Sequence, residues 1–83
     1  MKITEIRLRK VEDMGKVQAF AIVTFDEAFV VHGIKVIEGV NGLFVAMPNR
    51  KDKEGSFVDV AHPITAEFKT ELETAVLNEF NKA

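Results

Sequence analysis

The chain contains no cysteine, no tryptophan and no tyrosine among its 83 residues. Without thiols it can form no disulfide, no thiolate metal site and no cysteine nucleophile. No apolar stretch near its start has the length of a secretion signal, and none approaches the roughly 20 residues that cross a bilayer. These absences argue against secretion and membrane insertion, and they make the reducing cytoplasm the expected compartment.

Residues suited to nucleophilic or metal chemistry are also scarce. Ser56 is the only serine, and it lies in a Gly-Ser-Phe turn rather than a Gly-x-Ser-x-Gly motif. Gly39 to Gly42 lacks the lysine and the spacing of a phosphate-binding loop, so a hairpin turn explains it better. The two histidines are better explained structurally, His32 as a hydrogen-bonded core residue and His62 as an anchor before the helix. We therefore expect no enzyme activity, metal, other cofactor or small-molecule substrate.

The composition is typical of one small globular domain. Hydrophobic residues make up 47% of the chain and charged residues 29%. We expect a single domain over residues 1–83, which hides only about 60% of the surface of its unfolded chain. The net charge of −2 excludes a strongly basic, general nucleic-acid binder. The charge is uneven, however, because residues 1–24 carry +2 and residues 61–83 carry −2.

Apolar residues that alternate or form β-branched runs predict a sheet in the first two thirds of the chain. We expect strands at residues 3–11, 17–25, 28–38, 43–47 and 56–61, with a charged loop at residues 49–55. Gly15, the Asp26-Glu27 pair and the Asn41-Gly42 pair suit the tight turns between them, because such residues tolerate left-handed backbone angles or short polar connections. The connections are short, so the strands should be mainly antiparallel.

The apolar period changes after Pro63 to that of a helix. One helical stripe holds Phe68, Leu72, Ala75, Val76 and Phe80. Thr65 is placed to cap the first turn, and Glu67 suits the positive end of the helix dipole. We predict a helix over residues 66–81. The fold class is therefore α+β, an antiparallel β-meander of about five strands with a C-terminal α-helix.

A lone helix covers one face of a sheet, yet the central strands carry apolar residues on both faces. In residues 17–25, Ala19, Ala21 and Val23 share one face, whereas Phe20 and Ile22 share the other. Burial of apolar surface gains about 25 cal/mol per Å². We therefore expect a homodimer through the sheet, in which a second copy covers the exposed face or extends the sheet edge to edge.

Basic side chains could hold phosphate in two places. The candidates are Arg7, Arg9, Lys10 and Lys16 in and after the first strand, and Arg50, Lys51 and Lys53 in the expected loop. Arg7 and Arg9 are two residues apart in a strand, so both should leave the same face, and the planar fork of arginine suits phosphate. The same pattern also fits a solvated strand and a polar loop in which Asp52 and Glu54 neutralise their neighbours.

The aromatic residues favour phosphate contacts over base stacking. Most of the seven phenylalanines fit the expected core. Phe57, beside the basic loop, is the one candidate for an exposed stacking residue. Contacts to backbone phosphate are therefore more credible than base readout.

Four strings of residues, taken in order along the chain, resemble the bacterial stage V sporulation protein G (SpoVG) family. They are Arg7-Leu8-Arg9-Lys10, the eleven residues from Phe29 to Gly39, the eight from Asn41 to Pro48, and Ala61-His62-Pro63-Ile64. The resemblance runs over nearly the whole chain. It implies a small α+β protein that dimerises through its sheet, binds DNA and RNA, and regulates septation, gene expression and, in spore-forming hosts, sporulation.

The resemblance also implies which residues bind. Family members carry a basic pair after a Met-Pro dipeptide, a place that Arg50 and Lys51 occupy here, and Lys53 continues the basic loop. Arg7, Arg9 and Lys10 match the basic string of the first strand, and the family's use of its helix adds Lys69. The helix is acidic, however, with Glu71, Glu73 and Glu79. This leaves open a second interpretation, a protein-interaction adaptor in division control that does not bind nucleic acid directly.

Overall fold

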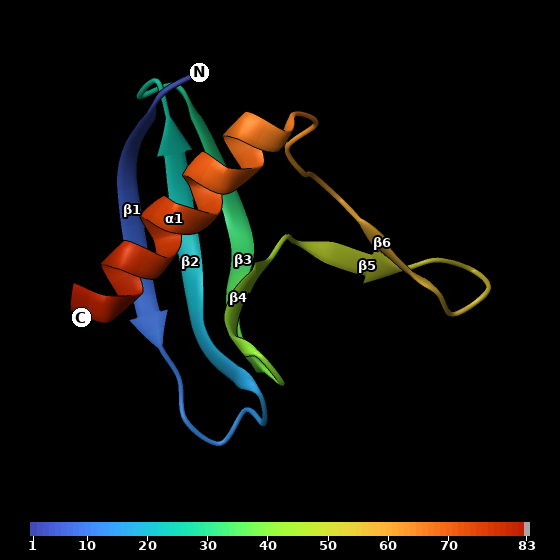
Figure 1. The fold of residues 1–83 in the computed structure, drawn as a ribbon. Coiled ribbons are helices and arrows are strands. Elements are labelled where there is room, and N and C mark those ends of the chain that lie inside the picture. Colours follow the sequence, from blue (N-terminus) through green and yellow to red (C-terminus); the bar gives the residue numbers. More distant parts are fainter. Residues whose placement is uncertain (83) are drawn as a thin grey trace.

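The computed structural model describes residues 1–82 as one twisted sheet, one small two-stranded ribbon and one helix (Figure 1). The elements in chain order are β1 (Ile3–Lys10), β2 (Val17–Phe25), β3 (Phe29–Gly39), β4 (Gly42–Ala46), β5 (Asn49–Lys51), β6 (Phe57–Asp59) and α1 (Ala66–Lys82). The large sheet is an antiparallel meander in the order β1-β2-β3-β4, and β5 pairs only with β6. This confirms the α+β class predicted from the sequence, whereas the expected dimer stays a prediction.

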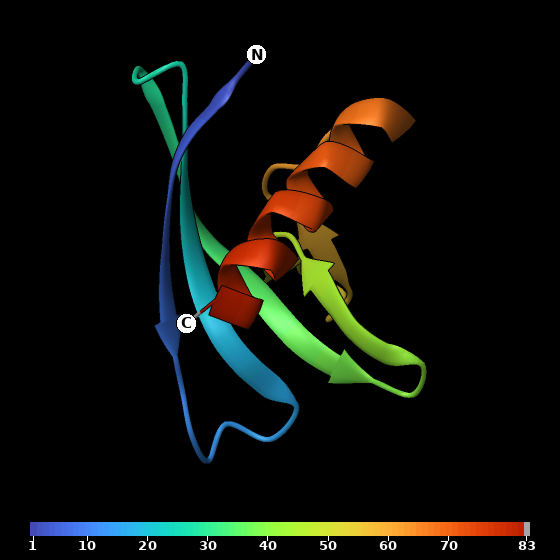
Figure 2. The same ribbon diagram turned by 60° about the vertical axis from the view of Figure 1, so that its left-hand side comes forward.

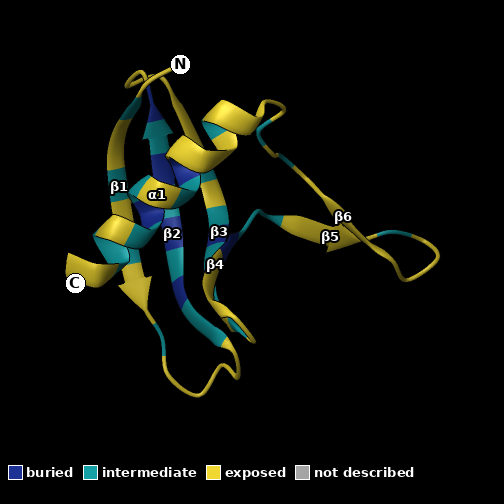
Figure 3. Cartoon of the chain, viewed as in Figure 1, coloured by how far each residue is buried: buried dark blue, intermediate teal, exposed yellow. Residues whose placement is uncertain are grey.

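The helix α1 lies across one face of the meander, and no element of residues 1–82 covers the other face (Figure 2). Alternate residues of β2 face the helix and are fully or almost fully buried, as the dark stripe in Figure 3 shows. The core contains Ala19, Ala21, Val23, Phe25, Ile34, Val36, Val45, Leu72 and Val76. Because β1 and β4 are the sheet edges, the core is deepest along β2 and β3.

A β-bulge in β3 changes which side chains reach the core. Between the pairs Ala21–Ile34 and Val23–Val31, β3 contributes one residue more than β2. Gly33 absorbs the bulge with a φ of +84°, a left-handed angle that favours glycine. Val31 and Ile34 therefore both pack on the helix side. The simple alternation assumed from the sequence placed them on opposite faces, and it was wrong at this point.

The connections between strands follow the predicted turns. Asp26 and Glu27 have φ angles of 52° and 53°, and the amide of Ala28 donates to the carbonyl of Phe25 at 2.9 Å. That geometry is a type I′ turn, whose twist matches the flanking strands. Gly15 also takes a positive φ, 64°. The β3–β4 turn falls one residue before the predicted pair, because Gly39 and Gly42 face each other and residues 40–41 form the loop.

The helix begins at its predicted cap. The Thr65 hydroxyl accepts a hydrogen bond from the Phe68 amide at 3.2 Å, and the Thr65 carbonyl accepts one from the Lys69 amide. The side chain thus satisfies one of the amides that a helix N-terminus leaves without a partner. Leu72 and Val76 of the predicted stripe are buried in the core. No helix in residues 1–82 is both long and apolar enough to cross a membrane.

The hairpin of β5 and β6 corrects the prediction of a loop at residues 49–55. Asn49 to Lys51 form a strand that pairs with Phe57 to Asp59, so only the tip between them is a loop. The fifth predicted strand therefore does not join the meander. Figure 1 shows the hairpin extending away from the sheet, and every residue in both of its strands is exposed.

The predictions about side-chain burial are confirmed in part. Phe57 is 67% exposed, as predicted, and Phe29 and Phe44 are also exposed, at 62% and 47%, whereas the other four phenylalanines are buried or half-buried. His32 is exposed beside the bulge rather than buried in a hydrogen-bonded core. His62 keeps its predicted place at the junction, with its Nδ1 atom 3.0 Å from the carbonyl oxygen of Pro63.

Candidate nucleic-acid interface

The sheet face opposite the helix, called the open face below, combines basic and apolar side chains. In an antiparallel sheet, directly opposed residues share a face. Phe20 is opposite Arg9 on one side and Lys35 on the other, and Arg7 is opposite Ile22. The same reasoning extends the face across β3 and β4. Its members are Glu5, Arg7, Arg9, Phe20, Ile22, Thr24, Val30, Lys35, Ile37, Phe44 and Ala46.

A shallow groove of about 310 Å³ runs over this face. Side chains from three strands line it, with Arg7 and Arg9 from β1, Phe20 and Ile22 from β2, and His32 from the bulge in β3. The bulge therefore places a potential hydrogen-bonding ring in the same groove as two guanidinium groups. An apolar floor with cationic walls suits a flat, anionic ligand.

The two arginines of β1 are accessible to such a ligand. Arg7 donates to Glu5 at 3.3 Å, but this ion pair is exposed, with 75% of the Arg7 side chain open to solvent. Exposed pairs of this kind contribute little and exchange readily. Arg9 makes no ion pair with any residue of 1–82 and is exposed. The structure therefore supports the predicted common face of Arg7 and Arg9.

Lys10 and Lys69 do not join that face within one chain. Lys10 follows Arg9 in the strand and so points to the helix side, where its Nζ atom lies 4.8 Å from the centre of the Phe80 ring. Lys69 is an exposed residue near the start of α1, on the same side as Lys10. The predicted patch of Arg7, Arg9 and Lys10 is therefore split between two faces.

The hairpin carries the second group of predicted residues. Arg50 and Lys51 stand in β5 and Lys53 in the tip, and all three are exposed. The Lys51 Nζ atom lies 5.6 Å from the centre of the Phe57 ring on the paired strand. This cation–π contact orients Lys51 across the ribbon without neutralising its charge.

The acidic residues of the hairpin do not pair with these cations in residues 1–82. One carboxylate oxygen of Asp52 accepts the amides of Glu54 and Ser56, both at 2.9 Å, so this side chain builds the turn. Asp52 and Glu54 thus form no direct ion pair with the hairpin cations in residues 1–82, and any neutralisation acts through the net charge of the hairpin. Three basic and three acidic residues still balance in residues 49–60, so the hairpin offers local cations and no net charge.

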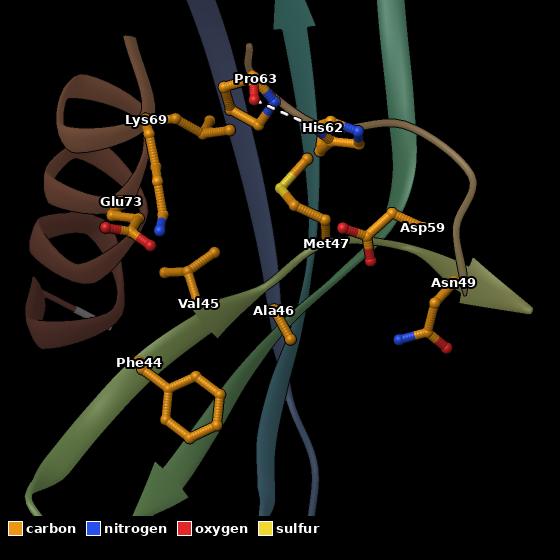
Figure 4. Close-up of a pocket in the computed structure, with 11 residues that line it drawn as sticks. Phe44, Val45, Ala46, Met47, Asn49, Asp59, His62, Pro63, Lys69 and Glu73 are labelled. Carbon is orange, nitrogen blue, oxygen red and sulfur yellow. Dashed lines mark hydrogen bonds between the residues drawn. The ribbon is translucent and has the colours of Figure 1, made fainter. Parts of the chain in front are cut away.

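Lys69 lies instead in a pocket of about 550 Å³ between α1, β4 and the base of the hairpin. Figure 4 shows Lys69 and Glu73 on the helix side of the pocket, and Asn49 and Asp59 on its opposite side. Because Glu73 and Asp59 share the pocket, its charge is mixed. Lys69 is therefore a weaker phosphate candidate than the arginines of β1.

Sequence reasoning missed Lys35 and His32 as members of the candidate site. Both follow from the register across β2 and β3, which the bulge at Gly33 shifts by one residue. A signal existed, because Lys35 is a lone charge between Ile34 and Val36 in an apolar run. Its side chain must point away from the face on which Ile34 and Val36 are buried.

A curved antiparallel meander with one helix on one face and a projecting two-stranded hairpin defines a class of small α+β proteins. A family model described as SpoVG matches residues 1–82 of this chain. The chain belongs to the SpoVG family, in agreement with the resemblance found in the sequence.

Relatives match over almost their full lengths. A protein of Caldanaerobacter subterraneus subsp. tengcongensis, named "Putative septation protein SpoVG", is 57% identical over 83 residues, which cover this whole chain and 91% of that protein. One of the same name from Clostridioides difficile (strain 630) is 57% identical over 83 residues, with 100% and 90% covered. A third, from Acetivibrio thermocellus, is 54% identical over 80 residues, with 96% and 85% covered.

Proposed function

We propose that this chain is a nucleic-acid-binding regulator, acting on DNA and on RNA, that influences septation and cell division. We propose that it also regulates gene expression and, in spore-forming hosts, sporulation. The names of the relatives support the link to septation. The exposed basic residues support nucleic acid as the ligand. The proposed compartment is the cytoplasm, and no catalytic activity, cofactor or small-molecule substrate is part of the proposal.

The observation that carries this proposal is the availability of the cations. Arg9, Arg50 and Lys53 are exposed, and none of them forms an ion pair within residues 1–82. Exposed cations without partners can neutralise phosphate and release its counterions, which drives binding even when the net charge of a protein is negative. Arg7 and Lys51 complete the primary set, with Lys10, Lys16 and Lys69 as secondary contacts.

A homodimer is the second part of the proposal. One chain holds its cations in separate places, on β1 and on the hairpin, so a second copy would double the number of anchoring points along one nucleic acid. The uncovered apolar residues supply a reason to associate. A groove of about 490 Å³ beside β3 and the start of α1 is lined by Phe29, Met47, Ile64 and Phe68, and Ile64 is 90% exposed.

That groove suits a second copy better than the open face does. No Lys, Arg, Asp or Glu side chain lines it. The open face carries Arg7, Arg9 and Lys35, and face-to-face pairing of two copies would bring like charges together. The isolated hairpin also favours a dimer, because a two-stranded ribbon alone is marginally stable in water and is stabilised by a partner.

Sedimentation velocity at micromolar concentration should show a dimer. The presence of monomer alone would contradict the proposed homodimer.

Charge reversal on the hairpin tests the nucleic-acid proposal. The double variant Arg50→Glu, Lys51→Glu should abolish a gel shift with duplex or single-stranded oligonucleotides while keeping the wild-type melting temperature and oligomeric state. A matched control is Lys2→Glu, Lys82→Glu, which changes the net charge equally at residues outside the candidate set. If both double variants bind like wild type, the hairpin cations are not contacts.

The alternative is a protein-interaction adaptor without direct nucleic-acid binding. The acidic side chains of α1 and the uncharged groove beside Phe29 and Ile64 favour it, because both are surfaces for a protein partner. The salt dependence of oligonucleotide binding distinguishes the two functions. Absence of binding to any oligonucleotide even at low salt supports the adaptor, whereas binding that weakens steeply with salt supports the regulator.

A further inference from the structure

We propose that the open face is a stacking platform that selects single-stranded over double-stranded nucleic acid. This inference rests on the proposed function and adds the class of ligand and the surface that recognises it. Three observations support it, namely an aromatic side chain flanked by cations, a groove beside that side chain, and a charge pattern that disfavours a second copy.

The first observation is the row of side chains across the sheet. Phe20 lies at its centre, directly opposite Arg9 on β1 and Lys35 on β3. Phe20 is partly exposed, and no element of residues 1–82 packs on this side of the sheet (Figure 2). A base stacked on the Phe20 ring would place its phosphates toward the two cations. Aromatic stacking with flanking positive charge is how single strands are held without sequence preference.

The groove supplies the second observation. It lies over Phe20 and Ile22 and is bordered by Arg7, Arg9 and His32. The His32 ring offers a further planar surface or a hydrogen-bonding nitrogen beside the stacked base. A base in a duplex is already stacked on its neighbours and presents only its edge to a protein. A flat apolar floor therefore favours strands whose bases are free.

Phe44 extends the platform toward β4. Its ring lies against Gly39, where an added Cβ atom would come within 2.9 Å of the ring. The glycine thus permits the aromatic ring to lie over the backbone, and Phe44 keeps 47% of its surface exposed. Because Phe44 is opposite Ile37 on the same face, a second base has an aromatic contact at the sheet edge.

The third observation concerns what else could cover this face. Arg7, Arg9 and Lys35 share this face with Glu5, which is already engaged with Arg7, and Glu27 lies at the end of the face beside Glu5 and Thr24. A symmetric contact between two copies would place six basic residues in one interface. An anionic polymer meets the same charges favourably, so charge complementarity assigns the face to nucleic acid.

The test compares binding of single-stranded and duplex oligonucleotides of equal length by fluorescence anisotropy. Phe20→Leu keeps an apolar side chain but removes the ring, and should weaken single-strand binding about 5- to 100-fold with little effect on duplex binding. Val40→Ala is the control, because Val40 is 97% exposed in the β3–β4 turn and lies outside both the platform and the groove proposed for a second copy. Thermal melting of each variant verifies that it folds.

A second pair of variants keeps the proposal testable if Phe20→Leu unfolds. Arg9→Gln and Lys35→Gln should each lower the salt slope of single-strand binding by about 0.7. Unchanged single-strand affinity in all folded open-face variants would overturn the inference. If the hairpin double variant still abolishes binding in that case, the proposed function stands without the platform. A shift from dimer to monomer in Phe20→Leu would instead assign the face to self-association and also overturn the inference.

Discussion

Arg9 and Lys10 are neighbours in β1, yet they lie on opposite faces of the sheet. Arg9 is paired with Phe20 on the open face, whereas Lys10 is paired with Ala19 and has its Nζ atom over the ring of Phe80 on the helix side. Because successive side chains of a strand alternate between its two faces, these neighbouring basic residues have different roles. One cation is available to a ligand, and the other contributes to the packing of α1 on β1.

This division predicts different effects for two adjacent substitutions. Arg9→Gln should weaken oligonucleotide binding several-fold and leave stability within about 0.5 kcal/mol, as for most surface substitutions. Lys10→Gln should lower the free energy of unfolding by about 0.5–1 kcal/mol through loss of the cation–π contact, with a smaller effect on binding. Anisotropy titrations and urea denaturation measure the two quantities. Equal losses of affinity in both variants would contradict the assignment of the two side chains to different faces.

The contact between helix and sheet depends on Leu72, which is 1% exposed. Leu72→Ala should reduce the free energy of unfolding by about 2–5 kcal/mol, because it removes buried methyl groups and leaves a cavity. Urea denaturation followed by circular dichroism measures the loss. Val40→Ala is the control, since Val40 is 97% exposed and its truncation should cost almost nothing. Similar losses of stability in Leu72→Ala and Val40→Ala would contradict the packing of Leu72 between the helix and the sheet.

The N-terminus of α1 depends on the hydroxyl of Thr65. Thr65→Ala removes the oxygen that accepts the Phe68 amide and should cost about 1 kcal/mol of stability. Thr65→Ser retains the hydroxyl and should stay close to wild type in the same denaturation experiment. If serine and alanine destabilise equally, the methyl group rather than the cap is what matters.

The bulge in β3 depends on the backbone freedom of Gly33. A β-branched residue is strained at a φ of +84°, so Gly33→Val should cost more than about 1 kcal/mol. Gly33→Asn should cost less, because asparagine tolerates left-handed angles. The order of the two melting temperatures is the measurement. A valine variant as stable as the asparagine variant would show that β3 can continue without the bulge.

The elements with strong periodicity could be predicted from the sequence, and those defined by pairing could not. The alternation in Val17–Phe25 and the stripe of α1 each placed their element within one residue. Strand β5 was missed because Asn49, Arg50 and Lys51 are polar and exposed on both sides, so neither face carries a pattern. Only its pairing with β6 makes this segment a strand.

The candidate site could likewise be predicted only where local alternation determines the position of a residue. Residue spacing within β1 correctly placed Arg7 and Arg9 on one face, since a strand alternates by itself. The lone charge of Lys35 between Ile34 and Val36 indicates that it leaves the core face, but its position opposite Phe20 depends on the strand register, which no local pattern reveals. The alternation in residues 17–25 correctly placed Phe20 on the face opposite Ala19 and Ala21.

The most direct test of the account is the salt dependence of oligonucleotide binding by the wild-type chain. If Arg7, Arg9, Arg50, Lys51 and Lys53 each neutralise one phosphate of a single strand, affinity should fall about 100-fold between roughly 50 and 200 mM salt. Anisotropy of a labelled oligonucleotide measures this. A steep loss is the predicted result, and the absence of any binding at the lower salt concentration would contradict the account.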